Sequence, residues 1–232
     1  MKVLLDQEGN KYLLDKGDLH THSGVVRGNK IKNGVVKSDL GKEFIVFEAE
    51  FVDKLEKIKR GPAILTKKDI GEIIAHTGIG KESNIVDGGT GCGVLAAFLG
   101  RISKNVVSYE IRKDFYDIAQ KNLKFLDVDV ILKNKDISKG ISEKNLDLIT
   151  LDMLEPWKVI KHAKKSLKSG GFLACYLTNI NQVITLVEKM EGFYLDKVLE
   201  TIEREWHVEG LKVRPKNKGL MHTGFLVFAR RI

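Results

Sequence analysis

The stretch "IVDGGTGCGVLAAFLG", residues 85–100, decides the fold. Its pattern predicts an apolar strand that ends at Asp87 and a helix that begins near Val94. Four glycines lie between the two elements: Gly88, Gly89, Gly91 and Gly93. Glycines at a strand-to-helix junction let the backbone turn sharply and approach a ligand closely. The spacing Asp-x-Gly-x-Gly-x-Gly argues against an NAD site, the nearest rival, whose loop reads Gly-x-Gly-x-x-Gly.

Strands and helices alternate along residues 60–232. In "TKKDIGEIIAHTGI", residues 66–79, three isoleucines fall on one helical face. Alternation of this kind predicts βαβ units and an α/β domain with a mostly parallel, doubly wound sheet. The last two expected strands, residues 197–208 and 223–232, follow each other without a long helix. That end of the sheet is therefore predicted to carry an antiparallel C-terminal strand.

Residues 1–59 have a different pattern. Short apolar pieces are broken by Gly and Asn, which predicts a small N-terminal β domain, with an open barrel as its expected form. The segment "KIKRGPAIL", residues 57–65, reads as a linker. The sequence thus divides into a β domain at 1–59 and a catalytic domain at 60–232.

Composition narrows the class of protein. The chain has 232 residues, 43% apolar and 30% charged, and a net charge of +8 that favours a polyanionic partner. Cys92 and Cys175 are too few for a disulfide scaffold. No apolar run approaches the roughly 20 residues of a membrane span, and the N-terminus lacks a signal-peptide pattern, so we expect a cytoplasmic protein.

The glycine loop matches the E/D-x-G-x-G-x-G loop of class I methyltransferases, which use S-adenosylmethionine (SAM). Glu110 ends the next expected strand about 20 residues on, where a carboxylate accepts from both ribose hydroxyls. Asp136 follows the third strand and is placed to accept from the adenine amino group. The expected cofactor-binding residues are Asp87, Gly89, Thr90, Gly91, Gly93, Val94, Glu110, Asp136 and Asp152.

Two further segments are more specific. "DMLEPW", residues 152–157, and "HTGFLVFARR", residues 222–231, resemble the tRNA adenine-N1 methyltransferase family, which modifies position 58 of the T-loop. "RGPAILTKKD" and "SYEIRKDFYDIAQKNL" resemble the same family in the same order. The resemblance implies a Rossmann-like class I methyltransferase domain behind a small β domain, SAM as cofactor, tRNA as partner, and a homotetramer.

The expected reaction assigns roles to individual side chains. Methylating adenine N1 leaves a cationic base, so Asp152 is expected to hold the exocyclic amine and stabilise the charge. Tyr176 matches a family position that faces the target base. Trp157 and His222 are weaker substrate-binding candidates, with helix packing and strand entry as their respective alternatives. A sulfonium leaving group needs little acid–base chemistry, so neither a metal nor a covalent intermediate is expected.

The chain departs from the family at Thr66 and Lys67, where Tyr or His followed by Pro is usual. The alternatives are action on another RNA, or a non-catalytic tRNA-binding subunit. The presence of Asp87, Glu110 and Asp152 favours an enzyme. The sequence does not distinguish an enzyme that modifies position 58 alone from one that modifies positions 57 and 58.

One competing motif stands near the N-terminus. "DLHTHS", residues 18–23, resembles the opening signature of PHP-family metal-dependent phosphoesterases, and on a strand His20 and His22 would share one face. Such enzymes need further His and Asp ligands, yet the chain has six histidines in all. The motif is therefore interpreted as the first turn and strand of the β domain.

Overall fold

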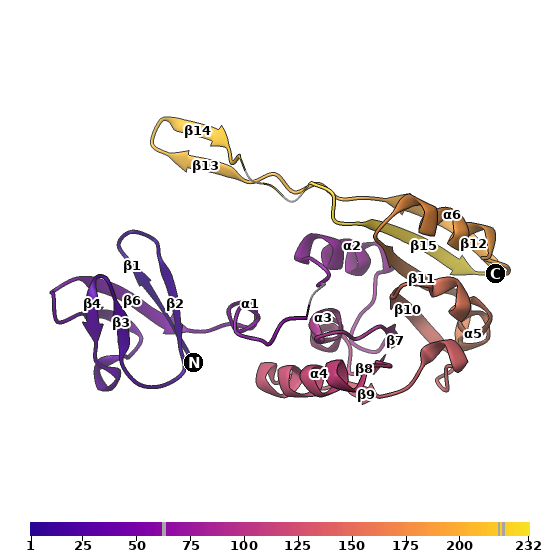
Figure 1. Cartoon of the computed structure of the whole chain (residues 1–232), viewed down its shortest axis with the longest axis horizontal. Helices are drawn as coiled ribbons and strands as arrows, with labels where there is room; N and C mark the ends of the chain where they lie inside the picture. Colours follow the sequence, from indigo (N-terminus) through magenta and orange to yellow (C-terminus); the bar gives the residue numbers. More distant parts are fainter. Residues whose placement is uncertain (62–63, 218, 220) are drawn as a thin grey trace. The chain divides into compact units, whose positions relative to one another are not determined.

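The structure is a computed structural model that describes residues 1–61, 64–217, 219 and 221–232. Pro62 and Ala63 of the expected linker lie outside the described residues, as do Lys218 and Leu220. The chain divides into two compact units, Met1–Ile58 and Lys59–Ile232 (Figure 1). Each unit has its own sheet.

The first unit is built from antiparallel strands. A four-stranded sheet has the order β2-β1-β6-β5, and β3 and β4 form a separate hairpin. The bounds are β1 (Lys2–Asp6), β2 (Lys11–Leu14), β3 (Leu19–Thr21), β4 (Gly24–Val26), β5 (Gly34–Lys37), β6 (Glu43–Glu48), the short helix η1 (Gly28–Lys30) and α1 (Phe51–Lys54). The β-rich unit expected from the sequence is present, but as two sheets rather than an open barrel.

The core of this unit follows from strand alternation. Phe44 and Val46 of β6 are buried, whereas Ile45 between them is exposed. Their buried side chains pack with Leu19 and Val26 of the β3–β4 hairpin. The hairpin therefore covers one face of the four-stranded sheet, and "HTHSGVV" forms the turn and strands of that cover.

The second unit contains a seven-stranded sheet of order β12-β15-β11-β10-β7-β8-β9. Neighbours from β11 to β9 are parallel, and β15 pairs antiparallel with both β11 and β12. The strands are β7 (Asn84–Gly88), β8 (Asn105–Tyr109), β9 (Ile131–Lys133), β10 (Leu146–Asp152), β11 (Leu167–Leu177), β12 (Phe193–Leu199) and β15 (Phe225–Arg231). The prediction of a mostly parallel sheet with an antiparallel C-terminal strand is confirmed.

Helices cover both faces of this sheet (Figure 1). They are α2 (Lys67–Thr77), α3 (Val94–Ile102), α4 (Lys113–Leu126), α5 (Ile160–Ser166), α6 (Ile180–Glu188) and the short η2 (Ile137–Lys139) and η3 (Pro156–Val159). Leu148 of β10 packs in one cluster with Ile73 of α2 and Leu99 of α3. Ile149, the next residue, packs in another cluster with Leu186 of α6. Alternation along β10 thus separates an α2–α3 face from an α5–α6 face.

The sequence missed one element. The expected strand at residues 197–208 is wrong, because β12 ends at Leu199 and the chain then enters a separate hairpin, β13 (Trp206–Glu209) with β14 (Lys212–Pro215). Gly210, with φ of +56°, begins its two-residue turn. Glycine adopts this left-handed backbone readily, so the turn was readable from "VEGLKV". Within the described ranges, no helix is long and apolar enough to span a membrane.

Candidate functional site

The glycine loop runs from the end of β7 to the start of α3. A Cβ on Gly89, whose φ is +93°, would lie 2.0 Å from the carbonyl oxygen of Asp152. The backbone N–H groups of Gly89 and Thr90 both donate to the carbonyl of Tyr109, at 3.0 and 3.2 Å. The loop therefore touches the ends of β8 and β10 through its backbone, and only glycine fits at position 89.

Asp87 is fully buried beneath this loop. Its carboxylate accepts hydrogen bonds from Ser108 Oγ at 2.6 Å and from Thr150 Oγ1 at 2.7 Å, and Ser108 also contacts Thr90 Oγ1 at 2.5 Å. Burial raises the pKa of Asp87, while the two hydroxyl donors lower it. Asp87 thus joins β7, β8 and β10 at the edge where the loop begins.

The sequence did not single out Ser108 and Thr150. Each stands two residues before an expected site carboxylate, Ser108 before Glu110 and Thr150 before Asp152. Residues two apart on a strand share a face, so a hydroxyl at that offset within an apolar strand was a usable signal.

Glu110 lies beside the glycine loop. One carboxylate oxygen accepts from the N–H of Gly91 at 2.8 Å, and the other accepts from the N–H of Arg112 at 2.9 Å. The side-chain amide of Asn134 donates to the carbonyl of Glu110 at 2.8 Å. These contacts hold the carboxylate at the carboxyl end of β8, next to the loop.

Asp136 follows β9 and caps η2. Its Oδ1 accepts from the N–H and the hydroxyl of Ser138 at 2.9 and 2.6 Å. The Ser138 hydroxyl is the largest cause of a lowered pKa for Asp136. Asp136 is therefore ionised at neutral pH, and its carboxylate is a strong acceptor for an amino group.

Asp152 and Tyr176 lie side by side at the ends of β10 and β11. Their Cα atoms are partners in the parallel register, so both side chains leave the same face of the sheet, the α2–α3 face. Burial, with a contribution from Asp87, raises the pKa of Asp152 to about 7. The Tyr176 hydroxyl donates to the carbonyl of Thr223 at 2.5 Å, and burial raises the pKa of Tyr176.

A small cavity of about 20 Å³ lies between the loop and Asp152. It is lined by Ile64, Leu65, Gly89, Thr90, Gly91, Cys92, Val94, Leu95 and Asp152. Five residues expected to bind the cofactor therefore share one cavity. Gly93, which does not line this cavity, is the N-cap of α3 with φ of +89°, and a Cβ added there would lie 3.4 Å from the Cβ of Ala119.

Asn122 of α4, which the sequence also did not reveal, is hydrogen-bonded to the glycine loop. The Asn122 amide donates to the carbonyls of Cys92 at 2.8 Å and Lys59 at 2.9 Å, and its oxygen accepts from the N–H of Lys59 at 3.1 Å. Asn122 is buried. A buried Asn in an amphipathic helix was the available signal, because such a group needs fixed partners.

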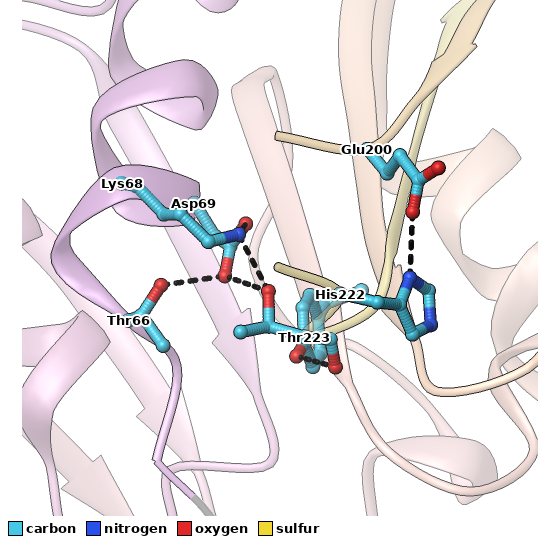
Figure 2. Close-up of polar contacts among 7 residues, drawn as sticks. Thr66, Lys68, Asp69, Glu200, His222 and Thr223 are labelled. Atoms are coloured by element: carbon cyan, nitrogen blue, oxygen red, sulfur yellow. Dashed lines mark hydrogen bonds and ion pairs between the residues drawn. The ribbon is translucent and has the colours of Figure 1, made fainter. Parts of the chain in front are cut away.

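Trp157 and His222 are not brought to the Asp152–Tyr176 pair. Trp157 packs on the α5–α6 face, where the Lys189 ammonium lies 5.5 Å from its ring centroid. His222 bonds through Nδ1 to Glu200 at 2.6 Å and packs on the ring of Phe225 (Figure 2). Both contacts are those expected of the packing alternatives, and a substrate-binding role for Trp157 and His222 stays a prediction.

Next to His222, the side chain of Thr223 points the other way, toward the first turn of α2 (Figure 2). There its hydroxyl contacts Lys68 and Asp69, which are both nearly inaccessible to solvent. Thr66 and Lys67 of this segment stand out in the sequence as departures from the family, whereas Lys68 and Asp69 carry no comparable signal.

The N-terminal motif does not assemble as a histidine pair. Among the described residues, the metal-ligand types that come together in this region are Asp6, Glu8 and His22, without His20. The Asp6 carboxylate already accepts from the N–H groups of Glu8 and Asn10, at 3.0 and 2.8 Å. It therefore serves the turn after β1.

The sequence of this chain is similar to those of known proteins. Residues 57–213 match the model of the tRNA methyltransferase complex GCD14 subunit family. The chain is 37% identical to the tRNA (adenine(57)-N(1)/adenine(58)-N(1))-methyltransferase TrmI of Methanocaldococcus jannaschii, an alignment that covers 99% of this chain and 94% of that protein.

Two solved structures are similar over the full chain. One is the tRNA (m1A58) methyltransferase TrmI of Aquifex aeolicus, with TM-score 0.87, 28% identity and 96% of that chain covered. The other is a Thermotoga maritima protein described as a SAM-dependent O-methyltransferase, with TM-score 0.91, 27% identity and 92% covered. The expected Rossmann-like class I methyltransferase fold is thus confirmed, and the chain belongs to the tRNA methyltransferase complex GCD14 subunit family.

Proposed function

We propose that this protein is a SAM-dependent tRNA methyltransferase that modifies N1 of the adenosine at T-loop position 58, with position 57 as a possible second target. The observation that carries the proposal is the pairing of Asp152 and Tyr176 beside the glycine loop. Family membership and the names of the similar proteins support the same reaction.

The chemical groups around the loop match those that SAM binding requires. Glu110 and Asp136 offer carboxylates for the ribose hydroxyls and the adenine amino group, and the loop offers close backbone approach. The cavity of about 20 Å³ is far below the roughly 300 Å³ of a small-molecule site, so SAM would need a wider form of this cavity. When bound, SAM supplies an electrophilic methyl group on a sulfonium sulfur.

Asp152 and Tyr176 then act on the target base. N1 lies on the Watson–Crick edge, so the base must leave its pairing, which costs a few kcal/mol. The Tyr176 ring provides a stacking surface worth on the order of 1–3 kcal/mol per base. Asp152, as a carboxylate, accepts from the exocyclic amine and stabilises the positive charge that grows on the ring as N1 is methylated.

The departure at Thr66 removes a stacking or hydrogen-bonding side chain over the cofactor or the target base. In this chain the Thr66 hydroxyl donates to Asp69 at 2.7 Å, and no aromatic ring is present at that position. We infer that Tyr176 carries the stacking alone on this side. The tRNA enters as a polyanion attracted by the net charge of +8, and the active assembly is expected to be a homotetramer.

The test is methyl transfer to an unmodified tRNA transcript. Purified protein, SAM and transcript are expected to yield N1-methyladenosine at position 58, located by nucleoside analysis and by the stop it causes in primer extension. Transcripts with guanosine at 58, at 57 or at both separate the two positions. Protein with Asp152→Ala serves as the inactive control.

Each outcome decides between the candidates. Transfer that persists when both adenosines are replaced would place the methylation at another nucleotide of the tRNA. SAM binding without transfer to tRNA would assign the enzyme to another RNA. Tight tRNA binding without any transfer and without SAM binding would assign a non-catalytic subunit. Light scattering of the same preparation measures whether the assembly is tetrameric.

A further inference from the structure

The first turn of α2 contains a buried ion pair. The Lys68 ammonium lies 2.8 Å from Oδ1 of Asp69, and their side chains are only 5% and 1% exposed. Asp69 Oδ2 also accepts from the hydroxyls of Thr66 at 2.7 Å and Thr223 at 2.8 Å, as Figure 2 shows. Lys68 donates to the Thr223 hydroxyl at 2.6 Å as well. The four side chains form one closed hydrogen-bond network.

This network joins segments far apart in the chain. Thr223, 154 residues beyond Asp69, stands just before β15. Its hydroxyl faces α2, while its carbonyl accepts the hydroxyl of Tyr176 at 2.5 Å. One residue therefore connects the ion pair through its side chain to Tyr176 through its backbone.

The next residue, Gly224, also lies close to the ring of Tyr176. A Cβ on Gly224 would lie 2.6 Å from Cζ and 2.7 Å from Cε2 of Tyr176, and 2.8 Å from the carbonyl oxygen of Leu177. Only glycine allows the segment to approach the Tyr176 ring so closely. A displacement of Thr223 or Gly224 would thus be transmitted directly to the phenol.

Stability alone does not account for this arrangement. Removing two charges from water is costly, and an apolar pair of similar size often stabilises a core as well or better. A fully bonded ionic network does, however, fix one geometry, since its members accept few alternative positions. The feature that this network fixes is the carbonyl that receives the Tyr176 hydroxyl.

We propose that Lys68, Asp69 and Thr223 are positioning residues that hold the Thr223 carbonyl and thereby fix the orientation of the Tyr176 ring over the target base. This inference rests on the proposed function, because it assigns Tyr176 to the base. None of the three contacts the reacting atoms; they act through Tyr176.

The variants follow from the contacts. Thr223→Val removes the hydroxyl and keeps the side-chain shape, and Thr223→Ser keeps the hydroxyl. Tyr176→Phe keeps the ring and removes the bond to Thr223. Thr77→Val is the matched control, since Thr77 is a buried threonine on the same helix whose hydroxyl donates to the carbonyl of Ile73 at 2.6 Å.

The decisive measurement is a double-mutant cycle in kcat. Thr223→Val is expected to lower kcat about tenfold, with SAM affinity unchanged and Thr223→Ser restoring activity to within about threefold. In the Tyr176→Phe background, the same Thr223→Val change is expected to lower kcat by less than about twofold, because the two residues act as one unit. Thr77→Val is expected to lower the melting temperature and leave kcat near wild type.

Two results would overturn the proposal in favour of a purely structural network. One is that Thr223→Val lowers kcat by the same factor in the wild-type and Tyr176→Phe backgrounds. The other is that Thr77→Val lowers kcat as much as Thr223→Val does. A readout without activity separates this result from failure of the proposed function. In protein labelled at the tyrosine Cζ, Thr223→Val is expected to shift the Tyr176 carbon resonance, whereas Thr77→Val does not. If Thr223→Val shifts the resonance but the wild-type protein methylates no tRNA, the proposed function is contradicted and the positioning of Tyr176 stands. An unshifted resonance in Thr223→Val would overturn the positioning itself.

Discussion

Asp152 and Tyr176 are register partners at the adjoining carboxyl ends of β10 and β11. Because parallel partners point to the same face, a carboxylate and a phenol ring stand next to each other over the glycine loop. The order of the sheet places β10 beside both β7 and β11, so the glycine loop and the pair proposed to bind the base meet at one strand. Asp152 lines the cavity at the loop and is also a member of that pair.

The first prediction concerns Asp152 itself. Asp152→Asn keeps the shape of the side chain but removes the charge that stabilises the cationic product, so kcat is expected to fall at least about 100-fold. SAM affinity, measured by calorimetry, is expected to change by less than about threefold, since cofactor contacts come mainly from the loop and Glu110.

Asp147→Asn is the matched control, because Asp147 stands near the opposite end of β10 and bonds to the N–H of Asn84. It is expected to keep full kcat. Loss of SAM binding in Asp152→Asn would show instead that Asp152 serves the cofactor.

The second prediction is a pH dependence of catalysis. The pKa of Asp152 is raised to about 7 in the unliganded protein, and the role proposed for it needs the ionised form. The value of kcat/KM for tRNA is therefore expected to rise with pH and to level off above about 7. A profile that is flat from pH 5.5 to 8.5 in the wild type would argue that protonation of Asp152 is not coupled to turnover.

The third prediction concerns stability against pH. A carboxyl whose pKa is raised on folding binds more protons folded than unfolded between about pH 4 and 7, so its contribution to stability is present at low pH and is lost as pH rises through 7. Above that range the wild type holds an uncompensated charge. Asp152→Asn is expected to stabilise the fold at pH 8 by roughly 1–4 kcal/mol and at pH 5 by much less. Equal melting-temperature shifts at both pH values would contradict this assignment.

The fourth prediction separates a clash from backbone strain. Gly89→Ala places a Cβ 2.0 Å from the Asp152 carbonyl, so it is expected to abolish SAM binding and to lower the melting temperature by several degrees. Gly78→Ala is the control, because Gly78 has φ of +61° with nothing within 4 Å of the added atom. Gly78→Ala introduces the backbone strain without the clash. It is expected to lower the free energy of unfolding by about 1 kcal/mol and to leave SAM binding intact.

The residues at the strand ends show which parts of the site can be predicted from the sequence. Asp87, Glu110 and Asp152 were predictable because a parallel sheet gathers the carboxyl ends of successive strands at one edge. Their neighbours Ser108 and Thr150 carry no motif, and only the register of β7, β8 and β10 brings both hydroxyls to Asp87. Local patterns find the strands, whereas contacts across them need the pairing.

The contacts of α2 show the same limit at longer range. Asp69 and Thr223 are 154 residues apart, and nothing near either residue predicts the other. His222 was a candidate because its segment resembles the family's, yet its side chain bonds to Glu200, whereas the Thr223 side chain points toward the first turn of α2 (Figure 2). Which of two adjacent side chains faces the site depends on the backbone, and the composition of "HTG" does not fix it.

The last prediction concerns Glu110 and the ribose. The side chain has two possible roles: it accepts from the Gly91 N–H in the structure, and it is proposed to accept from the ribose hydroxyls of SAM. Glu110→Gln is expected to weaken SAM binding at least about tenfold, while Asp114→Asn, which alters only an exposed ion pair with Arg112, leaves it unchanged. Adenosine, which carries the ribose but no methionine, distinguishes the roles. Competition by adenosine should weaken by the same factor as SAM, because the lost contact lies on the part the two ligands share. If adenosine competed as well as in the wild type while SAM binding fell, Glu110 would act by holding the loop through Gly91.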